Sequence, residues 1–287
     1  MRYGRNIFIL AAATVVAVSL MFAQGPAGAG GAKGGGAKAG GKGPGGAPAA
    51  NAKGQAPIDL TGTWVSLVTE DWLYRMVTPG KDAKGKADVA SVPINAAGRA
   101  AADAWDPAKD EAAGQQCKAY GAAGLMRVPG RLNIDWSDDN TLRIQADAGT
   151  QTRLMHFTGD VAGAASLQGF SKATWDGVGR GGAGRGAPPA AANVGPGGAA
   201  PIRAGAMKVI TTNLSGGYLR KNGVPYSANT VLTEYYDILH EPNGDQYLII
   251  STIVDDSANL TGLFRTSTHF KKEANGAKFK PSACSAR

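Results

Sequence analysis

Residues 230–271 read TVLTEYYDILHEPNGDQYLIISTIVDDSANLTGLFRTSTHFK, and this stretch decides the fold. It predicts three consecutive strands over Thr230–Leu239, Gln246–Val254 and Gly262–Lys271, because each segment is rich in Val, Ile, Thr, Tyr and Phe. Between the first two strands lies Glu241-Pro242-Asn243-Gly244-Asp245, in which the Pro and the Asn-Gly pair favour a tight turn. A polar connection precedes the third strand. The stretch is therefore typical of an antiparallel meander.

Further strand candidates lie upstream of the meander. Apolar residues at every second position predict a hairpin with arms at 132–136 and 142–146, which has one buried face and one wet face. The other strand candidates are Trp64–Val68, Trp72–Val77, Thr150–Phe157, Leu167–Trp175 and Met207–Leu214. A helix is predicted over Ile94–Trp105, with Asn95 as its N-cap and Asp106-Pro107 as its end.

These elements predict an all-β domain with one short helix. About ten strands with no alternation of strand and helix indicate an antiparallel β-barrel or a β-sandwich. We favour the barrel, because closure removes the exposed edges of a sheet.

The N-terminus has the composition of an export signal. A basic start and a run of sixteen mainly apolar residues, Ile7–Phe22, are followed by the small residue Ala23. This pattern predicts a signal peptide over residues 1–23. The alternative is a membrane anchor, but the run is shorter than the roughly 20 residues that span a bilayer. We therefore expect a periplasmic or extracellular protein with no membrane span after cleavage.

Two tracts of low complexity flank or interrupt the predicted domain at 57–287. Residues 24–56 consist mainly of Gly, Ala, Lys and Pro, and they predict a disordered linker. Residues 177–205 have a similar composition and predict a disordered insertion between two strands. The insertion opens with a formal match to the dinucleotide fingerprint, Gly177-Val178-Gly179-Arg180-Gly181-Gly182. Because no helix pattern follows it, we expect no nucleotide cofactor, and no other cofactor is indicated.

Most of the net positive charge lies before the domain. The chain has a net charge of +8, but six of its 30 Lys and Arg lie before Pro57 and all 22 Asp and Glu lie after it. The domain itself is close to neutral, so the sequence does not predict a nucleic-acid-binding face. We expect the Lys-rich linker to make weak contacts with anionic surfaces of the cell envelope.

The two cysteines, Cys117 and Cys284, predict a disulfide, since an even number of cysteines in an exported chain is usually oxidised. Two cysteines are too few for a structural zinc site. The histidines, His156, His240 and His269, fall in no metal-binding motif, so no metal site is predicted.

Glu234 is the most informative charged residue. It lies on the same strand face as Leu232, Tyr236 and Ile238, and a carboxylate on an apolar face needs a partner. We predict Arg127 as that partner. The pair could be a structural ion pair or a polar anchor in a ligand cavity, and the sequence leaves both interpretations open.

Other candidate site residues follow from position and type. His156 lies on the face of Leu154 and is predicted to point inward, either as a core histidine or as an acid–base group. Aromatic residues are expected to line a cavity. The candidate ligand-binding set is Glu234, Arg127, His156, Trp72, Tyr120, Trp175 and Tyr236. No Gly-x-Ser-x-Gly elbow occurs, so the usual mark of a serine hydrolase is missing from the sequence.

Two segments of the chain resemble known families. Gly62-Thr63-Trp64 resembles the opening Gly-x-Trp of the lipocalins, which implies a calycin-like barrel with the Trp closing one end and ligands entering the other. From about Asn95 onward the chain resembles a large uncharacterised family of exported bacterial proteins, common in acidobacteria and some proteobacteria. The matching elements are Asn95-Ala96-Ala97-Gly98-Arg99, Cys117-Lys118-Ala119-Tyr120-Gly121 with Met126-Arg127, Trp175-Asp176-Gly177, Leu232-Thr233-Glu234-Tyr235-Tyr236 and Ile253-Val254-Asp255-Asp256. The insertion after Gly177 and Ser257 in place of the usual Pro depart from that pattern. This resemblance implies export and a β-rich fold, and it carries no activity.

Three functions are compatible with the sequence. The leading expectation is an exported protein that binds a small apolar or amphipathic molecule in its barrel. The first alternative is an enzyme that uses an interior carboxylate with His156. The second is an interaction module of the cell envelope.

Overall fold

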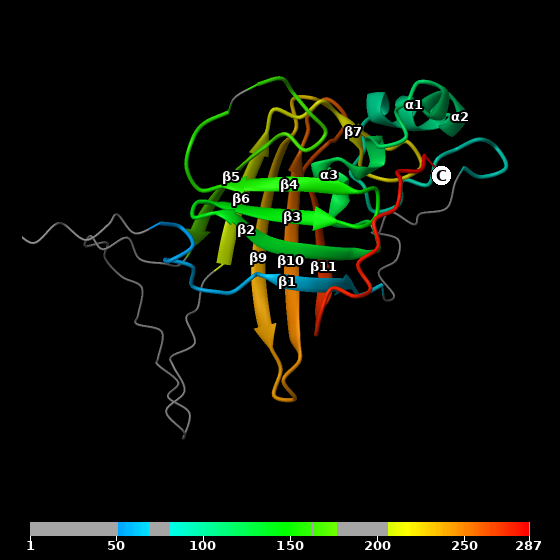
Figure 1. The fold of residues 1–287 in the computed structure, drawn as a ribbon. Helices are drawn as coiled ribbons and strands as arrows, with labels where there is room; N and C mark the ends of the chain where they lie inside the picture. The colour runs from blue at the N-terminus through cyan, green and yellow to red at the C-terminus, as the bar shows by residue number, and fades with distance from the viewer. Residues whose placement is uncertain (1–50, 69–80, 162, 177–205, 287) are drawn as a thin grey trace, which may run out of the picture. The chain divides into compact units, whose positions relative to one another are not determined.

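The computed structural model describes most of the predicted domain (Figure 1). The described residues are 51–68, 81–161, 163–176 and 206–286. The chain divides into two units, 1–46 and 47–287, and all described residues belong to the second. The predicted signal peptide, the strand predicted over Trp72–Val77 and the predicted insertion all lie outside the described residues.

Nine strands form a closed barrel, which confirms the predicted fold class. The strands are β1 (Gly62–Ser66), β2 (Arg131–Asp138), β3 (Thr141–Ala146), β4 (Gln151–His156), β5 (Phe170–Asp176), β6 (Ala206–Thr212), β9 (Val231–His240), β10 (Gln246–Asp255) and β11 (Phe264–Glu273). Their order around the barrel is β1-β11-β10-β9-β6-β5-β4-β3-β2, and β2 pairs again with β1. In Figure 1 the green strands β2, β3 and β4 cross in front of the orange strands β9 and β10.

The meander of β9, β10 and β11 is antiparallel, as the sequence predicts. Ile250 of β10 lies opposite Tyr236 of β9 and Thr268 of β11, so the three side chains share the inner face. One pair of strands departs from the prediction. β4 and β5 run parallel, with Met155 opposite Ser171, so the expectation of a purely antiparallel barrel is wrong here. The connection over residues 157–169 is long enough for the crossover that parallel strands need.

Short helical elements and a small hairpin lie beside the barrel. They are α1 (Ala96–Ala104), α2 (Pro107–Ala112), the 3₁₀ turn η2 (Lys118–Tyr120), α3 (Ala122–Leu125) and the paired strands β7 (Gly217–Tyr218) and β8 (Pro225–Tyr226). Asn95 caps α1 as predicted, since its side-chain oxygen accepts a hydrogen bond from the backbone N–H of Gly98 at 2.9 Å. Asp106 and Pro107 end α1 and also begin α2, with Asp106 as the cap. Among the helices in the described ranges, none is both long and apolar enough to cross a membrane.

One barrel end, which we call the Trp175 end, lies where β2, β4 and β5 finish. Three aromatic rings meet there, with centroid separations of 5.7 Å for Trp136–Phe157 and 4.8 Å for Phe157–Trp175. The indole N–H of Trp175 donates to the backbone oxygen of Ala52 at 2.9 Å, and Lys53 N–H donates to Asp139 O at 3.0 Å. Residues 51–56, assigned to the linker from sequence, are therefore hydrogen-bonded to the barrel.

The opposite end, which we call the Tyr226 end, lies where β2 begins and β3 finishes. Elements η2, α3, β7 and β8 cover it, and they contribute Tyr120 and Tyr226 to the packed interior. Between the two ends the inner side chains form a continuous apolar cluster. Trp64 of the Gly-x-Trp motif belongs to this cluster, where its indole N–H donates to Leu60 O at 2.9 Å.

Candidate functional site

Glu234 points into the barrel, as its position in the sequence predicts. It is 0 % exposed, and its neighbours on the same face of β9, Leu232 and Tyr236, are also fully buried. Burial of a carboxylate in this position requires a cation or several hydrogen-bond donors.

The partner of Glu234 is Arg153 of β4, so the prediction that Arg127 supplies the guanidinium is wrong. Arg153 Nη1 donates to Glu234 Oε1 at 3.0 Å, and Nη2 donates to Oε2 at 2.7 Å. This two-pronged geometry matches the planar fork of a guanidinium to a carboxylate. Both side chains are almost completely excluded from solvent.

Hydroxyl groups from neighbouring strands complete this polar centre. Arg153 Nη2 also donates to the hydroxyls of Ser171 at 3.3 Å and Thr211 at 3.2 Å, and those two hydroxyls lie 2.8 Å apart. Burial works to lower the pKa of Arg153, but the adjacent Glu234 and Tyr236 hold it above its usual value. Burial and the Glu234 charge raise the pKa of Tyr236 well above its usual value. The centre is therefore a fixed charge pair beside a protonated phenol.

Arg127 is buried at the Tyr226 end of the barrel. Its Nη2 donates to Ala123 O at 3.0 Å, and its guanidinium carbon lies 5.2 Å from the centre of the Phe264 ring. Stacking on an aromatic face and bonding to a carbonyl are both usual for a buried guanidinium.

His156 lies on the outer face of β4, so the prediction that it points inward is wrong. Leu154, which shares that face, is 41 % exposed, whereas Arg153 and Met155 face the interior. The His156 ring stacks on Phe170 with centroids 5.0 Å apart. The histidine and Glu234 are thus on opposite sides of the barrel wall, and they are not brought together as an acid–base pair.

The aromatic candidates do not form one site. Trp175 lies at the Trp175 end, Tyr120 is buried at the Tyr226 end, and Tyr236 lies beside the central ion pair. Trp72 lies outside the described residues. Phe157, which completes the aromatic cluster at the Trp175 end, was not among the sequence candidates, although the predicted strand Thr150–Phe157 includes it. In the structure it directly follows β4.

Sequence reasoning also missed a row of threonines on the inner face of β10 and β11. Thr252 lies opposite both Glu234 and Thr266, and Thr268 lies one inner position farther along β11. Their hydroxyl oxygens are buried and have no hydrogen-bond partner among the residues that the structure describes. The sequence does contain the pattern, since these threonines alternate with outward-facing residues along each strand. Thr is common in strands, however, so its presence there does not by itself indicate a site.

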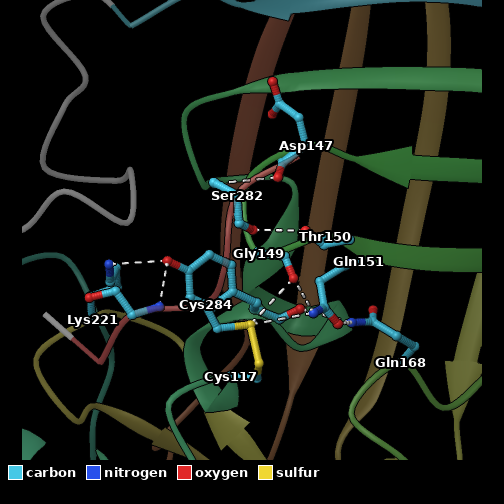
Figure 2. The surroundings of a disulfide bond; sticks show 11 residues. Cys117, Asp147, Gly149, Thr150, Gln151, Gln168, Lys221, Ser282 and Cys284 are labelled. Atoms are coloured by element: carbon cyan, nitrogen blue, oxygen red, sulfur yellow. Dashed lines mark hydrogen bonds between the residues drawn. A yellow bond between two sulfur atoms is a disulfide. The ribbon is translucent and has the colours of Figure 1, made fainter. Parts of the chain in front are cut away.

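The predicted disulfide between Cys117 and Cys284 is present (Figure 2). It holds the C-terminal segment against the turn between β3 and β4. There the Thr150 hydroxyl donates to Ser282 O at 2.8 Å, and Ser282 N–H donates to Asp147 O at 2.8 Å. The bond thus ties the segment after β11 to the Tyr226 end.

Within the described ranges, no group of three or more His, Cys, Asp or Glu side chains is arranged to hold a metal ion. The chain matches no family model, no curated protein and no solved structure. The resemblances to the lipocalins and to an uncharacterised exported family therefore stay predictions from sequence.

Proposed function

We propose that this protein binds a small amphipathic molecule inside its barrel. The observation that carries the proposal is the row of buried hydroxyls at Thr252, Thr266 and Thr268, which lack partners in the described part of the chain. A buried hydroxyl without a hydrogen bond costs about 1–3 kcal/mol. A ligand with its own polar group would remove that cost, because it would exchange hydrogen bonds with these side chains.

The Trp175 end offers the apolar complement. Met207 lies opposite Trp175 in the β5–β6 pair, and Met155 faces the interior from β4. Methionine side chains are flexible and repack easily, so this half of the interior can adapt to an apolar chain. The central ion pair of Arg153 and Glu234, in contrast, is held by several hydrogen bonds and forms a rigid polar boundary to this apolar half.

We also propose that the protein acts outside the cytoplasm. The pattern of residues 1–23 and the presence of a disulfide support export. The envelope contact of the Lys-rich linker stays a prediction, since Lys33, Lys38 and Lys42 of the linker lie outside the described residues.

The proposal is tested with the neutral apolar fluorophore N-phenyl-1-naphthylamine and with octanol as a competitor. We expect the fluorescence to rise on addition of the folded protein and to fall as octanol displaces the probe. The double variant Thr252→Val, Thr268→Val should bind octanol at least tenfold more weakly. It should also unfold at higher denaturant concentration, since it removes two buried hydroxyls that the free protein leaves unsatisfied.

Thr233→Val is the matched control, because Thr233 lies on the outer face of β9. It should leave octanol binding unchanged. If the wild-type protein neither enhances the fluorescence nor binds octanol, the proposal is wrong. If the control weakens octanol binding as much as the interior variant, the threonine row is not the site.

A further inference from the structure

A groove of about 410 Å³ lies on the outer face of the meander, beside the turn that joins β9 to β10. Four apolar or aromatic side chains line it, namely Leu67, Leu239, Tyr247 and Ile249. Its volume is within the range of about 300–1,000 Å³ that small-molecule sites occupy. The groove is outside the barrel and is therefore separate from the interior that contains the threonine row.

The register of the strands explains why these side chains meet. Ile249 of β10 lies opposite both Asp237 of β9 and His269 of β11, and Leu67 N–H donates to His269 O at 2.8 Å. A row of outward side chains therefore crosses from β9 to the segment that follows β1. Leu239, two positions after Asp237 on the same face, is 46 % exposed, so the apolar lining is open to solvent.

The turn beside the groove is held in place by its own interactions. Asp245 accepts hydrogen bonds from Lys271 Nζ at 2.8 Å and from Asn243 Nδ2 at 3.1 Å. Glu241 N–H donates to Asp245 O at 2.9 Å, which closes the turn. The hydrogen bond from Lys271 holds the pKa of Asp245 below its usual value, so these two residues compensate each other's charge.

The negative charge that remains at the groove has no cationic partner. Glu241 lines the groove, and Asp237 lies two positions before Leu239 as Glu241 lies two positions after it. Neither carboxylate forms an ion pair with a residue in the described ranges. Burial raises the pKa of Asp237, and no cation opposes that effect. The imidazole of His269, which also lines the groove, already has the Ser267 hydroxyl as a neighbour at 3.3 Å.

An apolar groove with an unpaired carboxylate at one end complements a molecule that joins an apolar chain to a cation. We propose that this groove binds an amphipathic cation such as an alkylammonium ion. The chain lies along Ile249, Tyr247 and Leu239, and the ammonium head lies at Glu241, with Asp237 adding negative charge. The site is distinct from the proposed interior site in both its place and the charge of its ligand.

The test is isothermal titration of the folded, oxidised protein with octylammonium at low ionic strength. We expect Glu241→Gln to bind this ion about threefold to fivefold more weakly than the wild type, as fits the loss of one exposed charge pair. Glu241→Lys should bind it at least tenfold more weakly, because the groove then carries a repelling charge. Asp255→Asn is the matched control, since Asp255 is an exposed carboxylate at the other end of β10, and it should bind the ion as the wild type does.

The variant Thr252→Val, Thr268→Val reports on the location of the bound ion. It should bind octylammonium within twofold of the wild type, because both threonines face the interior. If it binds the ion much more weakly, the ion lies inside the barrel and the inference is wrong. The inference is also wrong if the wild type does not bind octylammonium, or if Glu241→Gln is folded by thermal unfolding and keeps the wild-type affinity within twofold.

Sedimentation velocity tests a second copy of the chain as the occupant. We expect a monomer at all protein concentrations. A dimer that the substitution Leu239→Asn dissociates would mean that another copy fills the groove, and it would overturn the inference. The binding of octanol, which tests the proposed function, is measured separately, so failure of one proposal is distinguishable from failure of the other.

Discussion

At the residue scale, the buried pair of Arg153 and Glu234 makes the strongest prediction. Removing one partner leaves the other as an uncompensated buried charge, at a cost of roughly 3–5 kcal/mol. Arg153→Ala and Glu234→Ala should each lower the free energy of unfolding by about that amount in urea titrations. The double variant should cost far less than the sum of the two single variants, because neither charge is then stranded.

Arg143 and Asp135 provide the matched control. They form a two-pronged pair between β2 and β3, in which Arg143 donates through Nε and Nη2, but their side chains are 38 % and 39 % exposed. Arg143→Ala should lower the free energy of unfolding by no more than about 1 kcal/mol, as is usual for surface pairs. Equal costs at the buried and exposed pairs, or simple additivity at the buried one, would contradict the coupling of Arg153 to Glu234.

Also at the residue scale, Gly121 should not tolerate a side chain. Its backbone has an ordinary φ of −69°, so the constraint is space and not conformation. In Gly121→Ala the new methyl group would meet the Tyr226 hydroxyl, and we expect a loss of about 1–3 kcal/mol in the free energy of unfolding.

Tyr226→Phe should recover much of that loss in the double variant, since it removes the colliding oxygen. Gly262→Ala is the control, because a Cβ at Gly262 would meet no atom within 4 Å. If the loss at Gly121 persists unchanged without the hydroxyl, another contact is responsible.

The candidate site was predictable only in part at this scale. Glu234 stands out because it interrupts a regular apolar face. Arg153 does not, because the alternation in β4 is ambiguous: Leu154 suggests one face as the inner one, and Met155 suggests the other. The inner face of β4 is the one that carries Arg153, because Glu234 lies across the barrel from it. The sequence of β4 alone does not show where Glu234 lies. The same ambiguity led to the wrong face for His156.

At the element scale, β5 and β6 define how the predicted insertion can be removed. Asp176 and Ala206, the described residues that flank the segment 177–205, are paired across the two strands and therefore lie side by side. Replacing that segment with a short Gly-rich turn should leave the free energy of unfolding unchanged or raise it by up to about 2 kcal/mol. The reason is that the entropic cost of closing a loop grows only with the logarithm of its length. Thermal unfolding measures this directly. A loss of several kcal/mol would mean that the segment contributes packing to the barrel.

Elements with strong periodicity were predictable, and their exceptions have a common cause. The strands of the meander and of the β2–β3 hairpin follow from alternation and turn residues. The parallel pairing of β4 with β5 does not, because direction depends on how the connection over 157–169 crosses the barrel, and no local pattern encodes that path. Residues 51–56 were likewise assigned to the linker by composition, although their hydrogen bonds to the turn between β2 and β3 are made mainly by the backbone.

At the scale of the whole molecule, the disulfide joins two segments separated by 167 residues in the sequence. Closing so long a loop restricts the unfolded chain, and loss of such a bond typically costs about 2–5 kcal/mol. The double variant Cys117→Ser, Cys284→Ser should therefore unfold at a lower urea concentration than the oxidised protein. Addition of a reductant should shift the wild-type midpoint and leave that of the variant unchanged. Two free thiols in the unfolded, unreduced protein would contradict the prediction.

The closure of the barrel by β1 and β11 has a consequence for how the protein is made. Thr63 of β1 pairs with Glu273 of β11, so the barrel cannot close until the last strand has been made. A ribosome that adds about 5–20 residues per second delivers β1 long before its second partner exists. A chain that had formed β1 to β10 without β11 would be an open sheet with unpaired edges at β1 and β10. Cys284 follows the closing strand and is the later of the two cysteines to be made, so formation of its bond to Cys117 can serve as a chemical marker for molecules whose synthesis has passed the point at which the barrel can close.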